Sequence, residues 1–85
     1  MANLNVEIIT PAEVIFKGEA TSVSLPGSKA PFQVLSGHAP IVSSLDNGQI
    51  KVDTKNGEKI FQSSTGFAEI NNNKVSVLVE SAQES

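Results

Sequence analysis

The stretch LPGSKAPFQVLSGHAP, residues 25–40, decides how the chain is organised, because it places one short strand between two stiff loops. Pro26-Gly27 is a turn dipeptide, since proline presets the first turn angle and glycine accepts a positive φ. Pro31 removes a backbone donor and suits an edge strand or the start of a strand. The strand itself is expected to anchor in a core through Phe32, Val34 and Leu35.

The second loop of this stretch is Gly37-His38-Ala39-Pro40. Gly37 frees the backbone to turn, and Pro40 pushes Ala39 out of the helical region. Stiff loops on a rigid sheet are where a small β domain usually carries its binding surface. We therefore expect the binding function to lie in these two loops.

Upstream of this stretch, the sequence alternates as β-strands do. Residues 4–9 place Leu4, Val6 and Ile8 on one face, and Thr10-Pro11 ends that strand. Residues 14–25 form either one long bent strand or two strands divided at Gly18, because a glycine inside a strand usually marks a bulge or bend.

Downstream, further strands are expected between turn signals. Asp46-Asn47-Gly48, Lys55-Asn56-Gly57 and Asn71-Asn72-Asn73 predict hairpin turns, because asparagine and glycine tolerate positive φ. The strand at residues 75–79 is apolar on both faces at its centre, which favours a position deep in a sandwich. Many short strands with regular turns indicate one all-β domain over residues 1–85, a sandwich or barrel. Residues 81–85 form a polar tail that could begin a helix.

Composition excludes several classes of function. The 85 residues contain no cysteine, which excludes disulfides and thiolate metal sites. All six basic residues are lysines, and tryptophan and tyrosine are absent, so nucleic-acid binding is not expected. The four phenylalanines are assigned to the core. The apolar runs are too short to insert into a bilayer.

The residues also give no sign of an enzyme or of a cofactor. His38 is the only histidine, and no Gly-x-Ser-x-Gly elbow accompanies it. One histidine and scattered carboxylates do not have the spacing of metal ligands. Pro26-Gly27-Ser28-Lys29 is not a Walker motif, which argues against a phosphate site. The residues alone therefore indicate a non-enzymatic binding module, without metal or cofactor, that is a folded monomer when isolated.

Several segments together resemble a known family. They are LPG and GHAP in residues 25–40, the opening LNVEIITP, and the closing segments STGFAEI and NKVSVLVE. In this order they are similar to the epsilon subunit of F-type ATP synthase, whose mitochondrial counterpart is called delta. The resemblance covers nearly the whole chain. It implies a flattened ten-stranded β-sandwich without the C-terminal helical hairpin that the family usually adds.

The resemblance also implies a function and two partners. It implies a non-catalytic rotor subunit of the central stalk, peripheral to the cytoplasmic face of the bacterial inner membrane, which links the gamma subunit to the c-ring. The contacts with the c-ring would come from Ser28, Lys29, Ala30, Pro31 and His38. The contacts with gamma would come from Thr10, Gly37, His38, Ala39, Pro40 and Ser43. Lys29, Pro31 and Gln33 depart from the family's usual residues, so the contact with the c-ring is expected to use different chemistry.

A second interpretation is a free-standing β-sandwich that binds a ligand such as a sugar. The sequence disfavours it, because no tryptophan or tyrosine offers a stacking platform.

Overall fold

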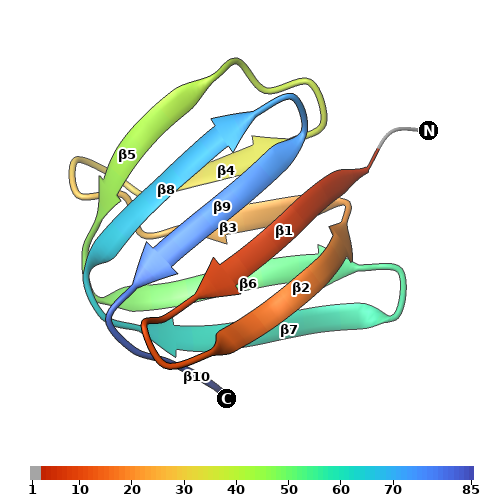
Figure 1. Ribbon diagram of the computed structural model, residues 1–85. Helices are drawn as coiled ribbons and strands as arrows, with labels where there is room; N and C mark the ends of the chain where they lie inside the picture. Colours follow the sequence, from red (N-terminus) through yellow and green to blue (C-terminus); the bar gives the residue numbers. More distant parts are fainter. Residues whose placement is uncertain (1–2) are drawn as a thin grey trace.

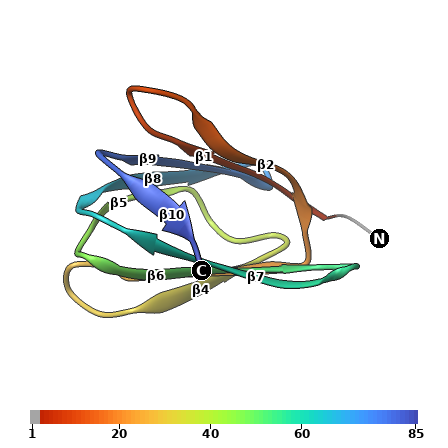
Figure 2. The same cartoon turned by 90° about the horizontal axis from the view of Figure 1, so that it is seen from below.

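The computed structural model describes residues 3–85, which form two five-stranded sheets packed face to face (Figures 1 and 2). The first sheet has the order β2-β1-β9-β8-β5 and the second the order β10-β7-β6-β3-β4. The strands are β1 (Leu4–Ile9), β2 (Val14–Ala20), β3 (Ser22–Leu25), β4 (Phe32–Leu35), β5 (Ile41–Leu45), β6 (Gly48–Thr54), β7 (Gly57–Ser63), β8 (Gly66–Asn71), β9 (Lys74–Val79) and β10 (Ala82–Glu84). The expected all-β sandwich is confirmed, and its two sheets remain separate rather than closing into a barrel.

Neighbouring strands are antiparallel except at one place, where β1 runs parallel to β9. The first and the ninth strands therefore meet in the middle of the first sheet (Figure 1). No helix within residues 3–85 has the length and apolar character needed to cross a membrane.

The core lies between the two sheets and consists of the side chains that point inward from each strand. Leu4, Val6 and Ile8 on β1 are at most 1% exposed, as the alternation predicts. Phe61 is the largest buried side chain, and the ring of Phe16 lies 5.8 Å from it, centroid to centroid. Burying one such large apolar side chain stabilises a fold by roughly 1.5–3 kcal/mol, so this shared core holds the two sheets together.

Two of the three predicted hairpins are confirmed. Gly57 turns β6 into β7 with φ 120°, and Asn72 and Asn73 turn β8 into β9 with φ 49° and 62°. The hairpin predicted at residues 46–48 is wrong, because β5 pairs with β8 while β6 belongs to the other sheet. The chain crosses between sheets there, and an Asn-Gly pair alone does not report which strand follows.

The long segment over residues 14–25 divides at Thr21 and not at Gly18. β2 continues through Gly18 to Ala20 in the first sheet, and β3 begins at Ser22 in the second. Thr21 donates two hydrogen bonds to the carbonyl oxygen of Asp53, from its backbone nitrogen at 2.8 Å and from Oγ1 at 3.1 Å. These bonds fix the crossing, while Gly18 gives room to the ring of Phe16, 3.3 Å from a Cβ placed there.

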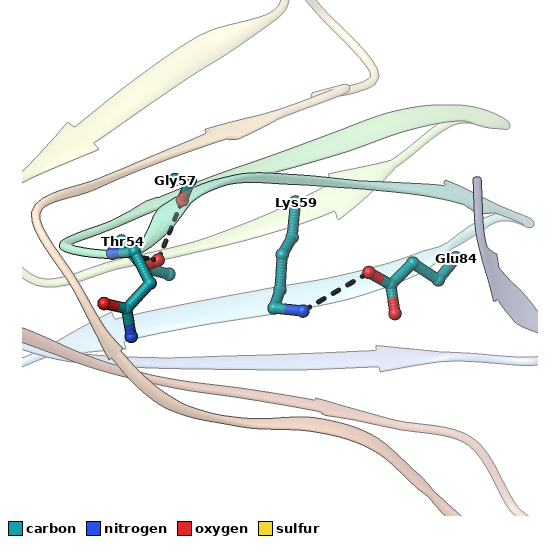
Figure 3. A network of polar contacts seen from close by, with 5 residues as sticks. Thr54, Gly57, Lys59 and Glu84 are labelled. Carbon is teal, nitrogen blue, oxygen red and sulfur yellow. Dashed lines mark hydrogen bonds and ion pairs between the residues drawn. The ribbon is translucent and has the colours of Figure 1, made fainter.

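The polar tail is an edge strand and does not begin a helix. Residues 82–84 form β10, which pairs antiparallel with β7. Figure 3 shows Lys59 Nζ reaching Glu84 Oε2 at 3.4 Å, near the turn in which Thr54 Oγ1 donates to the Gly57 carbonyl at 2.8 Å. An exposed ion pair contributes at most about 1 kcal/mol, so backbone pairing holds this strand in place.

Candidate protein-binding surface

The outer face of the first sheet carries a row of apolar side chains. Phe67 on β8 pairs with Leu78 on β9, Leu78 with Ile9 on β1, and Ile9 with Val14 on β2. Directly paired residues point to the same face of a sheet. Phe67, Leu78 and Val14 are 60%, 52% and 53% exposed. We call these three residues and Ile9 the apolar row.

Val42 on β5 extends this surface, since it lies two residues from Ser44, the partner of Phe67, and is 69% exposed. Val42 itself belongs to the neighbouring row on the same face, where it pairs with Glu69. The rest of that row is polar and consists of Glu69, Ser76, Glu7 and Lys17. Within residues 3–85, the outer face of the second sheet has no row of four paired apolar residues like this one. The row at the matching end of its outer face consists of glutamines, Gln83, Gln62 and Gln49. Of the two outer faces formed by residues 3–85, that of the first sheet is therefore better suited to burial against another protein.

A hollow of about 640 Å³ adjoins the apolar row at the end of the sheet where β1, β5 and β9 finish. Phe67 and Leu78 form part of its wall, together with Thr10 and Ser28. Its charged lining residues, Asp46 and Glu80, are both acidic. The hollow thus offers apolar wall beside negative charge.

The loop Ser28–Pro31 borders this hollow and is exposed throughout. Ser28 N donates to the Ser44 carbonyl at 2.9 Å, and Asp46 N donates to the Pro26 carbonyl at 2.8 Å. These two bonds fasten the base of the loop to the end of β5. Gly27 is required by close packing and not by positive φ, because a Cβ there would lie 2.5 Å from the Ala30 carbonyl oxygen.

The loop Gly37–Pro40 lies at the other end of β4 and β5, where the chain passes from the second sheet to the first (Figure 1). Gly37 has a positive φ of 85°, a conformation that glycine adopts without strain. His38 is half-buried, and its Nδ1 lies 2.7 Å from the Ala39 carbonyl oxygen, a hydrogen bond that requires the proton on Nδ1. Exposed Leu35 and Ile41 flank the loop.

The structure divides the residues predicted to contact partners into two groups. Thr10 and Ser28 line the same hollow, whereas the loop Gly37–Pro40 lies at the far end of β4 and β5. His38, predicted for both partners, therefore lies away from the loop Ser28–Pro31. Ser43 is half-buried in the middle of β5. The first sheet's outer face, with Val42 and the apolar row, extends between the two groups.

Thr10 has a local structural task. The residue is only 8% exposed. Its Oγ1 donates to the Glu13 carbonyl at 3.1 Å and accepts from Glu13 N at 3.2 Å. Thr10 thus holds the turn from β1 to β2, which presents Val14 at the end of the apolar row.

Sequence reasoning missed the apolar row and misplaced some side chains. Leu35 is 54% exposed and Phe67 60% exposed, so the prediction that both belong to the core is wrong. The signal for the row is present at Val77-Leu78-Val79, where three successive apolar residues predict a strand that is buried on both faces. Leu78 is instead on the open face, since nothing within residues 3–85 covers that side of the sheet. The same described residues contain no group of three or more histidine, aspartate or glutamate side chains placed to hold a metal ion.

Residues 3–85 match the family described as the ATP synthase, Delta/Epsilon chain, beta-sandwich domain. The chain belongs to this family. It is 41% identical over 80 residues to the ATP synthase epsilon chain of Campylobacter jejuni (strain 81-176), which is 93% of this chain and 62% of that relative. The epsilon chain of Chlorobium limicola is 39% identical over 75 residues, 87% of this chain and 85% of its own length. The chain thus spans less than two thirds of the Campylobacter protein and most of the Chlorobium one.

Two solved structures share the fold of this family member. One is the Euglena gracilis mitochondrial ATP synthase, OSCP/F1/c-ring in rotational state 1, with a TM-score of 0.91 at 22% identity over 99% of this chain and 54% of that chain. The other is the central stalk/c-ring of the Tetrahymena thermophila mitochondrial ATP synthase, with a TM-score of 0.80 at 15% identity over 96% and 66%. Both likenesses concern the sandwich as a fold.

Proposed function

We propose that this chain is a non-catalytic rotor subunit of the central stalk of F-type proton-translocating ATP synthase, which links the gamma subunit to the c-ring. The observation that carries the proposal is the apolar row, exposed on one face of a member of the epsilon family. An exposed apolar row on one outer face suits a domain to binding other proteins.

The two partners are assigned to different parts of the surface. The gamma subunit lies along the outer face of the first sheet, from the Thr10 turn across the apolar row to the loop Gly37–Pro40. The c-ring contacts the exposed loop Ser28–Pro31. His38 belongs to the gamma contact, because it lies at the opposite end of β4 from that loop. The two contact regions adjoin at the hollow, where Thr10 and Phe67 lie on one side and Ser28 on the other, so one small domain can hold two partners side by side.

The mechanism is mechanical, and it requires stiffness. Each sheet is a continuous set of five paired strands, and the shared core resists sliding between the sheets. The bonds that fasten the loop Ser28–Pro31 to β5 pass a load on that loop directly into the first sheet. Torque then passes between c-ring and gamma through a rigid body, at the cytoplasmic face of the bacterial inner membrane, without a catalytic group or cofactor in this chain.

A pull-down from detergent-solubilised membranes tests this proposal. The tagged wild-type chain is expected to retain both gamma and subunit c. Phe67→Ser combined with Leu78→Ser should lose most of the gamma while still folding, because both side chains are more than half exposed. Gln62→Ser on the outer face of the second sheet is the matched control and should retain both partners.

Each result has a defined meaning. If the wild-type chain retains neither gamma nor subunit c, the rotor proposal is wrong and the interpretation as a free-standing module takes its place. If the double variant retains gamma as well as the wild type does, the assignment of gamma to the apolar row is wrong. Circular dichroism of each variant confirms that the sandwich is intact before binding is compared.

A further inference from the structure

A side-chain hydrogen bond ties the loop Gly37–Pro40 to the first sheet. The backbone N–H of Gly37 donates to Oδ1 of Asn73 at 2.7 Å, across 36 positions of sequence. Asn73 lies in the turn between β8 and β9, so the bond joins that turn to a loop that has just left the second sheet. Among the hydrogen bonds described for residues 3–85, it is the one that joins this loop to the β8–β9 turn of the first sheet.

The backbone of Asn73 is fixed by the turn and by a hydrogen bond to β1. Asn72 and Asn73 both have positive φ, 49° and 62°, a conformation that glycine, asparagine and aspartate accept most readily. Of these three residue types, glycine supplies no acceptor. The carbonyl of Asn73 in turn accepts from Asn5 N on β1 at 2.8 Å. Asn73 is therefore held at its backbone by β1 and offers its side chain to the loop.

The loop has little else to define its position at this point. A Cβ placed on Gly37 would find no atom within 4 Å, so nothing packs against this residue on the side where a side chain would lie. The bond from His38 N to the Leu35 carbonyl, at 3.1 Å, shapes the loop internally and does not tie it to the first sheet. The same holds for the contact of His38 with Ala39. The end of the loop is positioned by β5, which begins at Ile41, whereas the start of the loop at Gly37 is tied to the first sheet through Asn73.

We propose that Asn73 is a positioning residue that holds the loop Gly37–Pro40 in its binding conformation beside the β8–β9 turn, at the end of the first sheet. The inference rests on the proposed function, in which this loop and the outer face of the first sheet bind gamma together. Asn73 acts through Gly37 and touches no partner in this role. A loop that is fixed before binding loses less conformational freedom on binding, so Asn73 raises the affinity for gamma without adding a contact.

Three substitutions test the inference. Asn73→Gly keeps the positive φ and removes the acceptor. Asn72→Gly makes the same change at the adjacent turn residue, which gives no side-chain bond to the loop, and is the matched control. Asn73→Asp keeps an oxygen acceptor in a residue that tolerates the left-handed region, and should rescue. For each variant we would measure the melting temperature, the hydrogen exchange of the Gly37 amide by NMR, and the dissociation constant for purified gamma.

Asn73→Gly should accelerate exchange of the Gly37 amide and weaken gamma binding by about fivefold, the factor that one ordinary hydrogen bond is worth. Its melting temperature should match that of Asn72→Gly, and Asn73→Asp should exchange and bind as the wild type does. An unchanged Gly37 exchange rate in Asn73→Gly overturns the inference, and so does faster exchange with unchanged affinity for gamma. If the wild-type chain does not bind gamma, the proposed function fails, and the exchange rates alone then decide whether Asn73 holds the loop.

Discussion

Gly66 is the glycine whose substitution the structure opposes most strongly. It begins β8, directly before Phe67 of the apolar row, and pairs with Val79 of β9. A Cβ added at Gly66 would overlap the carbonyl oxygen of Leu78 and lie 2.8 Å from Val79 Cγ1 and 2.9 Å from Val79 Cα. Two of these three obstacles are backbone atoms of the adjacent strand, so the strand itself has to move.

The expected loss of stability follows from that geometry. Forcing extra atoms into a packed site typically costs about 1–3 kcal/mol, and obstacles in the backbone place Gly66→Ala at the upper end of that range. Alanine also lowers the conformational entropy of the unfolded chain, which offsets roughly 0.4–1 kcal/mol of this loss of stability. A net loss of about 2 kcal/mol lowers the melting temperature of a domain of this size by roughly 8–16 °C.

Thermal unfolding followed by circular dichroism measures this loss. The matched control is Gly18→Ala on β2, where the nearest obstacle to a Cβ is the end of the Phe16 ring at 3.3 Å. A ring that is only half-buried can shift, so Gly18→Ala should stay within about 1 kcal/mol of wild type. The reasoning is refuted if Gly66→Ala melts within a few degrees of the wild-type chain, or if the two alanine variants lose equal stability.

Three further predictions follow from particular residues. Gly37→Ala and Gly57→Ala both place alanine at positive φ, 85° and 120°, in open space, so each should destabilise the fold by about 1–2 kcal/mol in urea unfolding; only Gly37→Ala should also weaken gamma binding, and equal weakening by both would contradict a role for the loop. His38→Glu should melt within a few degrees of wild type, since substitutions outside the core usually change stability by about 0.5 kcal/mol, yet it should lose gamma in the pull-down; unfolding, or undiminished retention of gamma, contradicts this. The pKa of Lys51 is raised above its ordinary 10.5, chiefly by the hydrogen bond to Glu58 and to a smaller extent by the negative charges of Glu58 and Asp53. A raised pKa stabilises the fold below pH 10.5 and ceases to do so as pH rises through the folded value, so the advantage of wild type over Lys51→Gln in melting temperature should disappear at strongly alkaline pH, and a constant difference between the two would contradict the assignment.

The sequence predicted well those features that depend on residues close together in the chain. The chain turns at Gly57 and at Asn72-Asn73, as predicted from the tolerance of these residue types for positive φ. The alternation of Leu4, Val6 and Ile8 identified a core face, because a strand repeats every two residues whatever its neighbours are. The resemblance to the epsilon family then supplied the number of strands, which local patterns alone do not give.

The features that sequence reasoning missed depend on strands that are distant in the chain. The Asn-Gly signal at residues 47–48 is local, but whether the following strand pairs with β5 depends on β8, which comes later in the chain. Leu78 looks like a core residue because hydrophobicity does not report which face of a strand is covered. The apolar row becomes visible only when the registers of four strands are known together. The Asn73 contact with Gly37 depends in the same way on tertiary placement.

The parallel pairing of β1 with β9 has a consequence for assembly. The apolar row takes Val14 and Ile9 from the start of the chain and Phe67 and Leu78 from near its end, so no partial chain lacking β9 carries the complete surface. On the ribosome, β1 can pair early with β2 but has to wait for almost all the later strands before it meets its other neighbour, β9, which makes this parallel pairing a late event in folding. A partner that recognises the completed row therefore binds only chains in which β9 has paired with β1, so that, under the proposed function, assembly would also test whether the subunit has folded completely.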